Sequence, residues 1–550
     1  MHMASGIPKT LHDYYQSSPM REGVLCWYPF ENDAVALDLS GGALTGLLRK
    51  RCASVKTSCG RDDKFDYIMA LDPEDFGIGV LASFKEKLDP HGRLLLAYEN
   101  PFALRYWAGK RSPGTGLQYD SLFGRGGGVS KAELAARLKQ AGFEGQKWYY
   151  PLTDHWFTRE VYSEGYLPDE YLNQRFTPYV ADDAGLQFDE RALYREIIRG
   201  GAFEFMCGAY LVEARACGSD EPCPVDYAAV TAYREPAKRF ATVVSSNGRA
   251  YKIPLHEEAR ERMQIILRNH GDLARSGVNV VPLRLENDAL VMERMEFPTL
   301  WDYWADKLTN GSFDENEMFR HLDKIRDAIL KSAVSGKCYW ELVPANCFYD
   351  AAKDEPVFFD QEYCWENAPP DIALARAILS IRYSPALRSD PRSEGWLRDL
   401  KARYNLNERW EMLERLVNDD TYREVFGDRQ NALTDETARA MERAAAAHRG
   451  RRLSPIAEKL RSLGHTHPAI YGFGKRGKAL RKALFENGFE IAAVYDRELT
   501  PDASIEEFLS DGAADSIIVS VLQGMEIAED LRKRTGIPVY TAEELLNGQP

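Results

Sequence analysis

Apolar, strand-like runs that alternate with helical stretches constrain the fold of this chain most strongly. Near the start, the runs are Ala34–Leu39, Phe65–Ala70 and Gly92–Ala97, with a helical stretch at Gly79–Leu88. Residues 467–547 repeat the alternation near the end. Because apolar strands alternating with helices form parallel sheets with helices on both faces, the sequence predicts a multidomain α/β protein.

The chain length predicts three or four domains, since 550 residues exceed what one hydrophobic core organises. The expected domains are residues 11–216, 225–448 and 460–550. Between the first two lies Cys217–Pro224, which is rich in Gly, Pro and acidic residues. The Ala- and Arg-rich stretch Glu436–Arg452 predicts a helix that leads to the last domain.

The overall composition excludes some partners. A net charge of −14 disfavours nucleic acid, whose phosphates require a basic surface. There is no apolar stretch of about 20 residues, so no transmembrane segment is expected, and Met1–Ser5 does not resemble a secretion signal. We therefore expect a cytoplasmic protein.

The cysteines give one further indication. Nine are scattered without paired metal spacing, and only Cys217 and Cys223 enclose a short acidic loop. Two ordinary thiols are the favoured interpretation, with a disulfide or half a metal site as alternatives.

The turn after the first predicted strand is the first candidate ligand site. Small residues there let backbone N–H groups approach a ligand, and an acid at the strand end can hold a ribose or amino group. The candidate residues are Asp38, Ser40, Gly41, Gly42 and Gly46.

Several segments carry a family resemblance. Leu88–Leu94 (LDPHGRL) resembles the L-x-P-G-G-x-L turn of class I S-adenosylmethionine methyltransferases. Ser17–Phe30, Tyr98–Gly109, Ser130–Phe143 and Tyr149–Pro168 resemble bacterial methyltransferases fused to kinase-like domains, such as the O-antigen methyltransferase–kinases. The resemblance implies a Rossmann-like methyltransferase fold, S-adenosylmethionine as cofactor, a sugar or glycan acceptor, and a place in cell-surface polysaccharide synthesis.

The first domain departs from that family in one respect. Gly46 and Phe65 are only 19 positions apart, whereas one βαβ unit takes ~30 residues. No acid in Ala53–Asp63 stands clearly where the second strand would bind a ribose, Asp62 and Asp63 being the nearest. The sequence therefore predicts a shortened core and an incomplete adenosine pocket.

The middle of the chain predicts a strand-rich part followed by a helical part. Asn247-Gly248 between two strand-like runs is a strong hairpin signal. The expected elements are strands at Arg239–Ser245, Arg249–Ile253, Val280–Leu285 and Ala289–Glu293, a helix at His256–Asn269, and mostly helices over 299–448.

Within this region, Tyr339–Asn346 matches the spacing of the kinase catalytic loop H-R-D-L-x-x-x-N. Lys252 then corresponds to the phosphate-binding lysine and Glu341 to the catalytic Asp, while Asn346 and Asp360 correspond to the Mg²⁺ ligands. A protein-kinase-like bilobal fold with ATP and Mg²⁺ is expected.

Parts of this kinase pattern are altered. Glu258 or Glu261 is the candidate ion-pair partner of Lys252. Glu341 replaces Asp and Tyr339 replaces His, and Ser245–Gly248 is the nearest candidate for a phosphate loop. Under the alternative interpretation, Asn346 and Asp360 only cap loops.

The last domain contains Ala469–Gly477, a G-x-G-x-x-G between a strand and a helix. Gly472, Gly474 and Gly477 are the candidate binding glycines, and Asp496 is the candidate ribose-binding acid. A small Rossmann-like domain that binds NAD(P) or another nucleotide is predicted.

Three functional interpretations follow. The first is an enzyme of bacterial surface-glycan synthesis that transfers methyl or phosphoryl groups to a sugar, working with other glycan-synthesis proteins and as a possible homo-oligomer. The second is a non-catalytic binding or scaffolding protein with degenerate sites. The third is a nucleotide-sugar dehydrogenase or sensor that works through the last domain.

Overall fold

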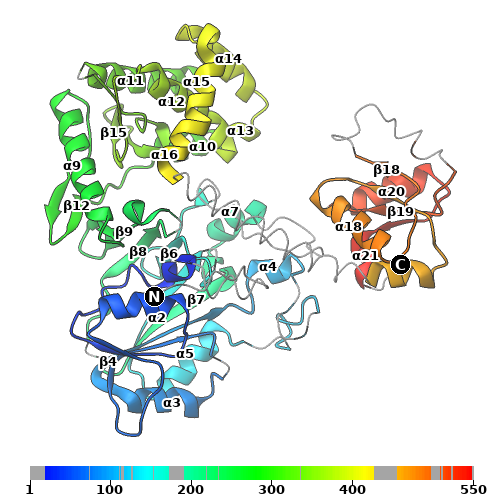
Figure 1. The fold of residues 1–550 in the computed structure, drawn as a ribbon, viewed down its shortest axis with the longest axis horizontal. Helices are drawn as coiled ribbons and strands as arrows, with labels where there is room; N and C mark the ends of the chain where they lie inside the picture. Colours follow the sequence, from blue (N-terminus) through cyan, green and yellow to red (C-terminus); the bar gives the residue numbers. More distant parts are fainter. Residues whose placement is uncertain are drawn as a thin grey trace.

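The computed structural model of the 550-residue chain describes residues 19–172, 191–426, 455–496, Phe508 and 512–547. Within these ranges, residues 74, 111, 113, 114, 116, 126, 127, 153, 219, 233, 335, 522 and 523 are not described. Figure 1 shows a mixed α/β protein. The helix predicted at Glu436–Arg452 and the N-terminal segment Met1–Ser5 lie outside the described residues.

One sheet of twelve strands runs through the first and second parts of the chain, in the order β11-β12-β10-β9-β8-β6-β5-β7-β4-β3-β1-β2. We call residues 19–216 the first unit, 225–426 the second unit and 455–547 the third unit. The strands of the first unit are β1 (Val35–Asp38), β2 (Ser54–Lys56), β3 (Phe65–Leu71), β4 (Leu88–Glu99), β5 (Gly145–Leu152), β6 (Glu160–Ser163) and β7 (Ala209–Arg215).

In the first unit, β2, β1, β3 and β4 are parallel, and the strand order reverses between β1 and β3. The strand β7 is antiparallel to both β4 and β5. The helices are α2 (Ala43–Arg51), α3 (Ile78–Lys87), α4 (Leu104–Trp107), α5 (Lys131–Gln140), α7 (Arg191–Arg199) and α8 (Phe203–Met206). The predicted strands and the helix near residues 79–88 are confirmed.

Both faces of this sheet are buried, which explains the uninterrupted apolar runs in the sequence. On β4, Leu94 and Leu96 belong to one hydrophobic cluster, while Leu95 and Ala97 belong to a second cluster on the opposite face. Successive side chains of a strand point to opposite faces, so a strand covered on both sides must be apolar throughout.

The sheet does not stop at the predicted boundary. The strand β8 (Val225–Val230) pairs antiparallel with β6 on one side and with β9 (Phe240–Ser245) on the other. Ala228 and Ala241 also share a hydrophobic cluster with Ala36 of β1. The first two units are thus joined by backbone hydrogen bonds and a common core, although composition alone separates them.

The second unit contains the predicted hairpin. The strands β9 and β10 (Arg249–Pro254) are antiparallel, and Gly248 adopts a φ of 81° in the turn between them. The other strands are β11 (Arg284–Glu286), β12 (Ala289–Glu293), β13 (Lys337–Cys338), β14 (Cys347–Asp350), β15 (Glu355–Phe358) and β16 (Trp365–Glu366). The predicted strand at Val280–Leu285 was largely wrong, because Val280 forms only an isolated bridge to Phe358.

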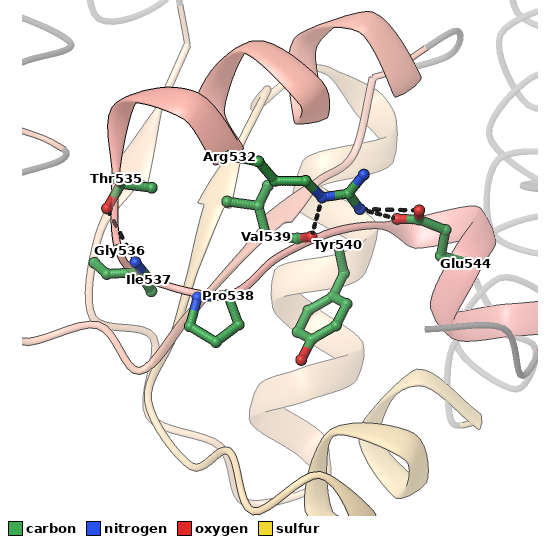
Figure 2. Close-up of a pocket in the computed structure, with 8 residues that line it drawn as sticks. All are labelled: Arg532, Thr535, Gly536, Ile537, Pro538, Val539, Tyr540 and Glu544. Atoms are coloured by element: carbon green, nitrogen blue, oxygen red, sulfur yellow. Dashed lines mark hydrogen bonds and ion pairs between the residues drawn. The ribbon is translucent and has the colours of Figure 1, made fainter.

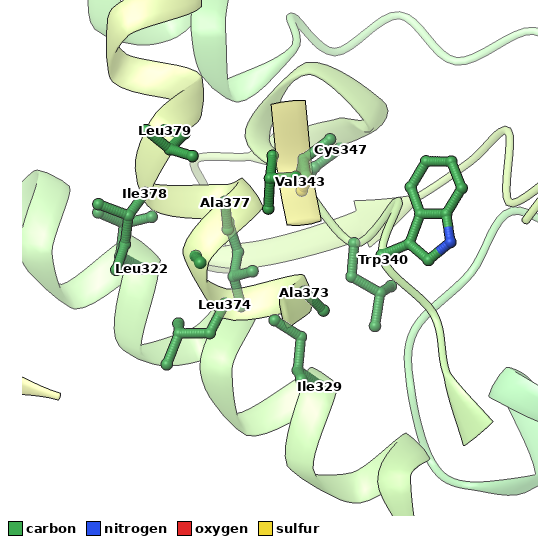
Figure 3. Close-up of a cluster of buried hydrophobic side chains, with 14 of the residues drawn as sticks. Leu322, Ile329, Trp340, Val343, Cys347, Ala373, Leu374, Ala377, Ile378 and Leu379 are labelled. Carbon is green, nitrogen blue, oxygen red and sulfur yellow. The ribbon is translucent and has the colours of Figure 1, made fainter. Parts of the chain in front are cut away.

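Helices make up the rest of the second unit. They are α9 (Ala259–Arg275), α10 (Leu300–Thr309), α11 (Glu315–Ala333), α12 (Asp371–Tyr383), α13 (Pro385–Ser389), α14 (Ser393–Arg403), α15 (Trp410–Arg415) and α16 (Thr421–Phe426). Figure 3 shows Leu322 and Ile329 of α11 and Ala373 of α12 packed near Trp340 and Val343. This buried cluster fixes the segment that carries Glu341.

The third unit has a parallel sheet of four strands in the order β18-β17-β19-β20, with the order reversing between β17 and β19. Its elements are β17 (Pro468–Tyr471), α18 (Lys475–Glu486), β18 (Val494–Tyr495), β19 (Ser516–Val519), α20 (Met525–Arg534), β20 (Val539–Thr541) and α21 (Ala542–Asn547). Among the helices in the described ranges, none has the length and apolar character needed to cross a membrane.

Candidate functional site

The turn after β1 is organised by Asp38. Its carboxylate accepts hydrogen bonds from Ser40 N at 2.8 Å and Gly41 N at 3.3 Å, and from the Thr45 hydroxyl at 2.5 Å. The Asp38 side chain is buried, and both its oxygens are engaged. Asp38 therefore holds the shape of the turn, and a ligand would meet the backbone of the turn rather than this carboxylate.

Space remains around the turn. Gly41 and Gly42 adopt φ values of 68° and 66°, a region that favours glycine. A Cβ atom at Gly41 or Gly46 would meet nothing within 4 Å. The Ser40 hydroxyl accepts from Leu71 N at 3.0 Å, which ties this turn to the end of β3.

The neighbouring strand lacks a ribose-binding acid. The short strand β2 ends at Lys56, whose ammonium group lies 2.8 Å from Asp63 Oδ1. Gly60 N donates to the other oxygen of Asp63 at 2.8 Å. The strand β3 follows β2 along the chain with no helix between them in the described residues.

A group of charged side chains that the sequence analysis missed lies at the carboxyl ends of β3 and β4. We call it the carboxyl-edge cluster, and its members are Arg21, Asp72, Glu99, Arg105, Lys110, Asp154 and His155.

The centre of the cluster is an ion pair. Asp72, directly after β3, lies 2.7 Å from His155 Nε2 and has 34% of its side chain exposed, against 1% for His155. Burial disfavours the charged imidazole, but the adjacent Asp72 carboxylate outweighs it, and the pKa of His155 is raised. Arg21 lies over the Trp156 ring, 4.5 Å from its centroid, and desolvation lowers its pKa despite Asp72 and Asp38 nearby.

The rest of the cluster is also paired. Glu99, the last residue of β4, lies 2.9 Å from Lys110 Nζ and 3.5 Å from Arg105. Burial opposes ionisation of Glu99, yet the two cations lower its pKa to about 2. Arg105 also contacts Asp154 at 3.1 Å. The cluster is thus a buried charge network with Asp72 at its exposed side.

In the second unit, Lys252 of β10 lies between two carboxylates. Its ammonium group donates to Asp360 and to Glu362, and Arg234 contacts Glu362 at 3.1 Å. Burial opposes the charged form, but the two carboxylates raise the pKa of Lys252 well above its usual range. We call Lys252, Asp360 and Glu362 the lysine cluster.

The lysine cluster corrects the expected ion pair. Glu258 is mainly exposed and lies 4.0 Å from His256, and neither Glu258 nor Glu261 contacts Lys252 among the described residues. Glu362, two positions after Asp360, is the partner instead. Glu362 lies in the sequence Phe359–Tyr363 (FDQEY), but its position beside Lys252 depends on tertiary packing and has no local signal in the sequence.

Glu341 is buried rather than directed to an acceptor. Its Oε2 accepts hydrogen bonds from Glu362 N at 2.6 Å and Tyr363 N at 3.1 Å. Burial and the neighbouring Glu362 carboxylate raise the pKa of Glu341 to about 8. The carboxylate holds the backbone of the lysine cluster, so the position that a catalytic base would need is taken by a structural contact.

The predicted Mg²⁺ ligands are neighbours. Phe359 N donates to the Asn346 carbonyl at 3.0 Å, which places Asn346 beside the residue that precedes Asp360. Asp360 has a φ of 54°, and its side chain is 41% exposed. One Asp360 oxygen accepts a hydrogen bond from Lys252, so only the other oxygen could bind a metal ion while that contact holds. Ser245–Gly248, the candidate phosphate loop, forms the hairpin turn.

In the third unit, the Gly motif packs a strand against a helix. A Cβ atom at Gly477 would lie 2.0 Å from the Gly472 carbonyl, and Gly472 has a φ of 89°. Gly474 is open, with nothing within 4 Å of a built Cβ atom. Asp496 accepts a hydrogen bond from Phe473 N, so it supports the turn as Asp38 does in the first unit.

A shallow pocket also lies in the third unit (Figure 2). Its lining residues are Arg532, Thr535, Gly536, Ile537, Pro538, Val539, Tyr540 and Glu544. Arg532 donates to Glu544 at 2.8 and 2.9 Å and to the Val539 carbonyl at 3.0 Å. None of the binding or catalytic residues predicted from the sequence lines this pocket. The Arg532 guanidinium in the pocket is already paired with Glu544.

A scan against protein-family models and a search of the curated proteins found no match to this chain.

Proposed function

We propose that this chain is a binding protein of bacterial cell-surface glycan synthesis, related to the methyltransferase–kinase fusions. In this proposal, the first unit binds a nucleoside-type ligand or glycan at the carboxyl-edge cluster. The second unit has a kinase-like arrangement of residues and does not transfer phosphoryl groups. The third unit takes a nucleotide at the Gly474 turn.

The observation that carries the proposal is the environment of Glu341. Phosphoryl transfer requires a carboxylate within reach of the acceptor hydroxyl. Here the carboxylate is buried and accepts two backbone hydrogen bonds. The Lys252 ammonium, which would bind phosphates, is neutralised by Asp360 and Glu362. A lysine–glutamate ion pair such as Lys252–Glu362 is also a feature of active kinases, so it is Glu341 that would have to leave its backbone donors before it could act as a base.

The first unit, in contrast, has an open turn and a partly exposed acid where a ligand could bind. Ligands bind outside the carboxyl ends of strands, at the point where the strand order reverses. The open turn at Gly41 and the partly exposed Asp72 lie at such a point, between β1 and β3.

S-adenosylmethionine fits this edge only in part. The open turn suits a ligand that approaches the backbone, but Lys56 stands at the end of β2, where an acid would bind the ribose hydroxyls. Because half of the expected site does not fit, we derive no methyl-transfer step from it.

Ligand binding and ATP turnover test the proposal together. In a thermal-shift assay, S-adenosylmethionine or a nucleotide-sugar should raise the melting temperature, since a bound ligand stabilises by RT ln(1 + [L]/Kd). ATP–Mg²⁺ turnover on a glycan acceptor should be absent. Turnover that is abolished by both Lys252→Ala and Asp360→Ala would establish an active kinase and overturn the proposal.

A further inference from the structure

Three side chains of different chemistry meet at the amino end of β4, one of them far in sequence from the other two. They are His91 of β4, and Cys217 and Asp220 of the segment that follows β7. Their ligand atoms all lie within 4.8 Å of one another, and His91 Nδ1 is 2.8 Å from Asp220 Oδ1. They share none of the residues of the carboxyl-edge or lysine clusters.

The backbone around these side chains is held in place. Ala216 N donates to the Gly92 carbonyl at 3.1 Å, which joins the start of β4 to the segment after β7. Arg93 donates to the Glu221 carbonyl at 3.2 Å, and Gly218 N donates to Glu144 at 3.2 Å. The three candidate ligands are therefore presented by two segments that are fixed against each other.

One atom of the group, Asp220 Oδ2, lies where a cation could contact it. Asp220 Oδ2 is shielded from solvent and accepts no hydrogen bond among the described residues, although the other oxygen contacts His91. A buried carboxylate oxygen without a partner is costly, so such an atom usually contacts a cation or an ordered water. His91 itself stands where the L-x-P-G-G-x-L turn has its first glycine.

We propose that His91, Cys217 and Asp220 bind a zinc ion. Imidazole, thiolate and carboxylate are all zinc ligands, and a thiolate disfavours Mg²⁺ and Ca²⁺. Bonds of about 2.0–2.3 Å place tetrahedral ligand atoms roughly 3.3–3.8 Å apart. The three ligand atoms lie within 4.8 Å of one another, and the 2.8 Å contact of His91 with Asp220 would have to open by about half an ångström to admit the ion. The Cys217 thiol would lose its proton to solvent on binding, and water would complete the coordination.

The ion would join β4 to the segment that leads into β8. Because β8 begins the second unit, zinc would stiffen the connection between the first two units. This inference is independent of the proposed function, since it involves neither a nucleotide nor a glycan.

The test uses the full chain and Zn²⁺ or Co²⁺ alone. We expect one equivalent of Zn²⁺ by titration against a chelator, and a thiolate-to-cobalt charge-transfer band with Co²⁺. Cys217→Ser should abolish the band, and His91→Ala should weaken binding at least tenfold. His91 is 80% exposed, so its replacement should leave the melting temperature of the zinc-free chain unchanged.

Cys59→Ser is the matched control, because Cys59 is an exposed thiol outside the site. It should keep both the stoichiometry and the cobalt band. The proposal is overturned if no stoichiometric Zn²⁺ is bound, or if binding persists in both Cys217→Ser and His91→Ala, or if Cys59→Ser loses it to the same extent.

Discussion

The carboxyl-edge cluster and the lysine cluster are both buried charge networks, but they differ in what they leave open. In the first, Asp72 is 34% exposed beside an open glycine turn. In the second, the Lys252 and Glu362 side chains are 6% and 3% exposed and contact each other, while the Asp360 side chain, 41% exposed, is held by Lys252. Opposite charges that satisfy each other inside the protein are not available to a ligand without a large desolvation cost.

The difference also concerns the supporting acids. Asp38 and Glu341 both accept backbone N–H groups, but Asp38 shapes a turn that stays open, whereas Glu341 closes the backbone around Lys252. A segment can therefore keep the spacing of a motif while its side chains make structural contacts. The turn in the first unit stays open at Gly41, whereas Glu341 and Glu362 in the second unit make internal contacts.

The largest expected effect comes from Lys252→Ala. Removing the cation leaves two carboxylates close together, one of them buried, so we expect the free energy of unfolding of the second unit to fall by about 3 kcal/mol. Denaturant unfolding measures this. The control Lys56→Ala breaks an exposed ion pair and should cost below about 1 kcal/mol. Equal effects of the two substitutions would refute the locked lysine cluster.

Asp38→Ala should come next, because it leaves partly buried amide donors of the turn without an acceptor. The expected loss is about 2 kcal/mol in the first unit, with faster hydrogen exchange at Ser40 and Gly41. Thr45→Val removes a single donor to Asp38 and should cost less. If exchange at these two amides does not change, Asp38 does not hold the turn.

Glu341→Gln should change the pH dependence of stability. In the unfolded chain Glu341 ionises near its ordinary pKa, but in the folded chain only near pH 8, so its contribution lowers stability as pH rises from about 5 to 8. The amide keeps an acceptor oxygen and cannot ionise, so the variant should show a flatter profile over this range. An unchanged slope in urea titrations at several pH values would contradict the assignment.

Asp72→Asn gives the smallest effect. Since the Asp72 carboxylate is what raises the pKa of His155 against the effect of burial, the variant should titrate His155 at lower pH than the wild type. The stability that this pair adds is complete below the ordinary pKa of histidine and is lost as pH rises through the raised value. NMR titration of the His155 imidazole measures this pKa, and the control Asp75→Asn should leave the pKa of His155 unchanged.

The sequence predicted elements whose signals are local. The strand at Ala289–Glu293 and the hairpin around Gly248 were confirmed because periodicity and turn chemistry act over a few residues. The helix expected at His256–Asn269 is α9, which begins at Ala259 and extends to Arg275. The continuous sheet was not predicted, since strand pairing between β6 and β8 leaves no local mark.

The same distinction applies to the candidate sites. Asp72 was missed although it directly follows a buried strand, where the rule that ligands bind at the carboxyl ends of strands would have identified it. Arg21 and His155 depend on partners far along the chain, as in the contact of His155 with Asp72 across 83 positions. The backbone hydrogen bonds that Glu341 accepts were also not predicted, because they depend on where the Glu362 N–H group lies in the folded chain.

Hydrogen exchange of the full chain, with and without ligands, tests the central claim most directly. Saturating S-adenosylmethionine or a nucleotide-sugar should protect residues 38–46 and the segment around Asp72, while ATP–Mg²⁺ should leave residues 339–363 unchanged. Protection of residues 339–363 by ATP–Mg²⁺, with no ligand protecting the first unit, would contradict the account.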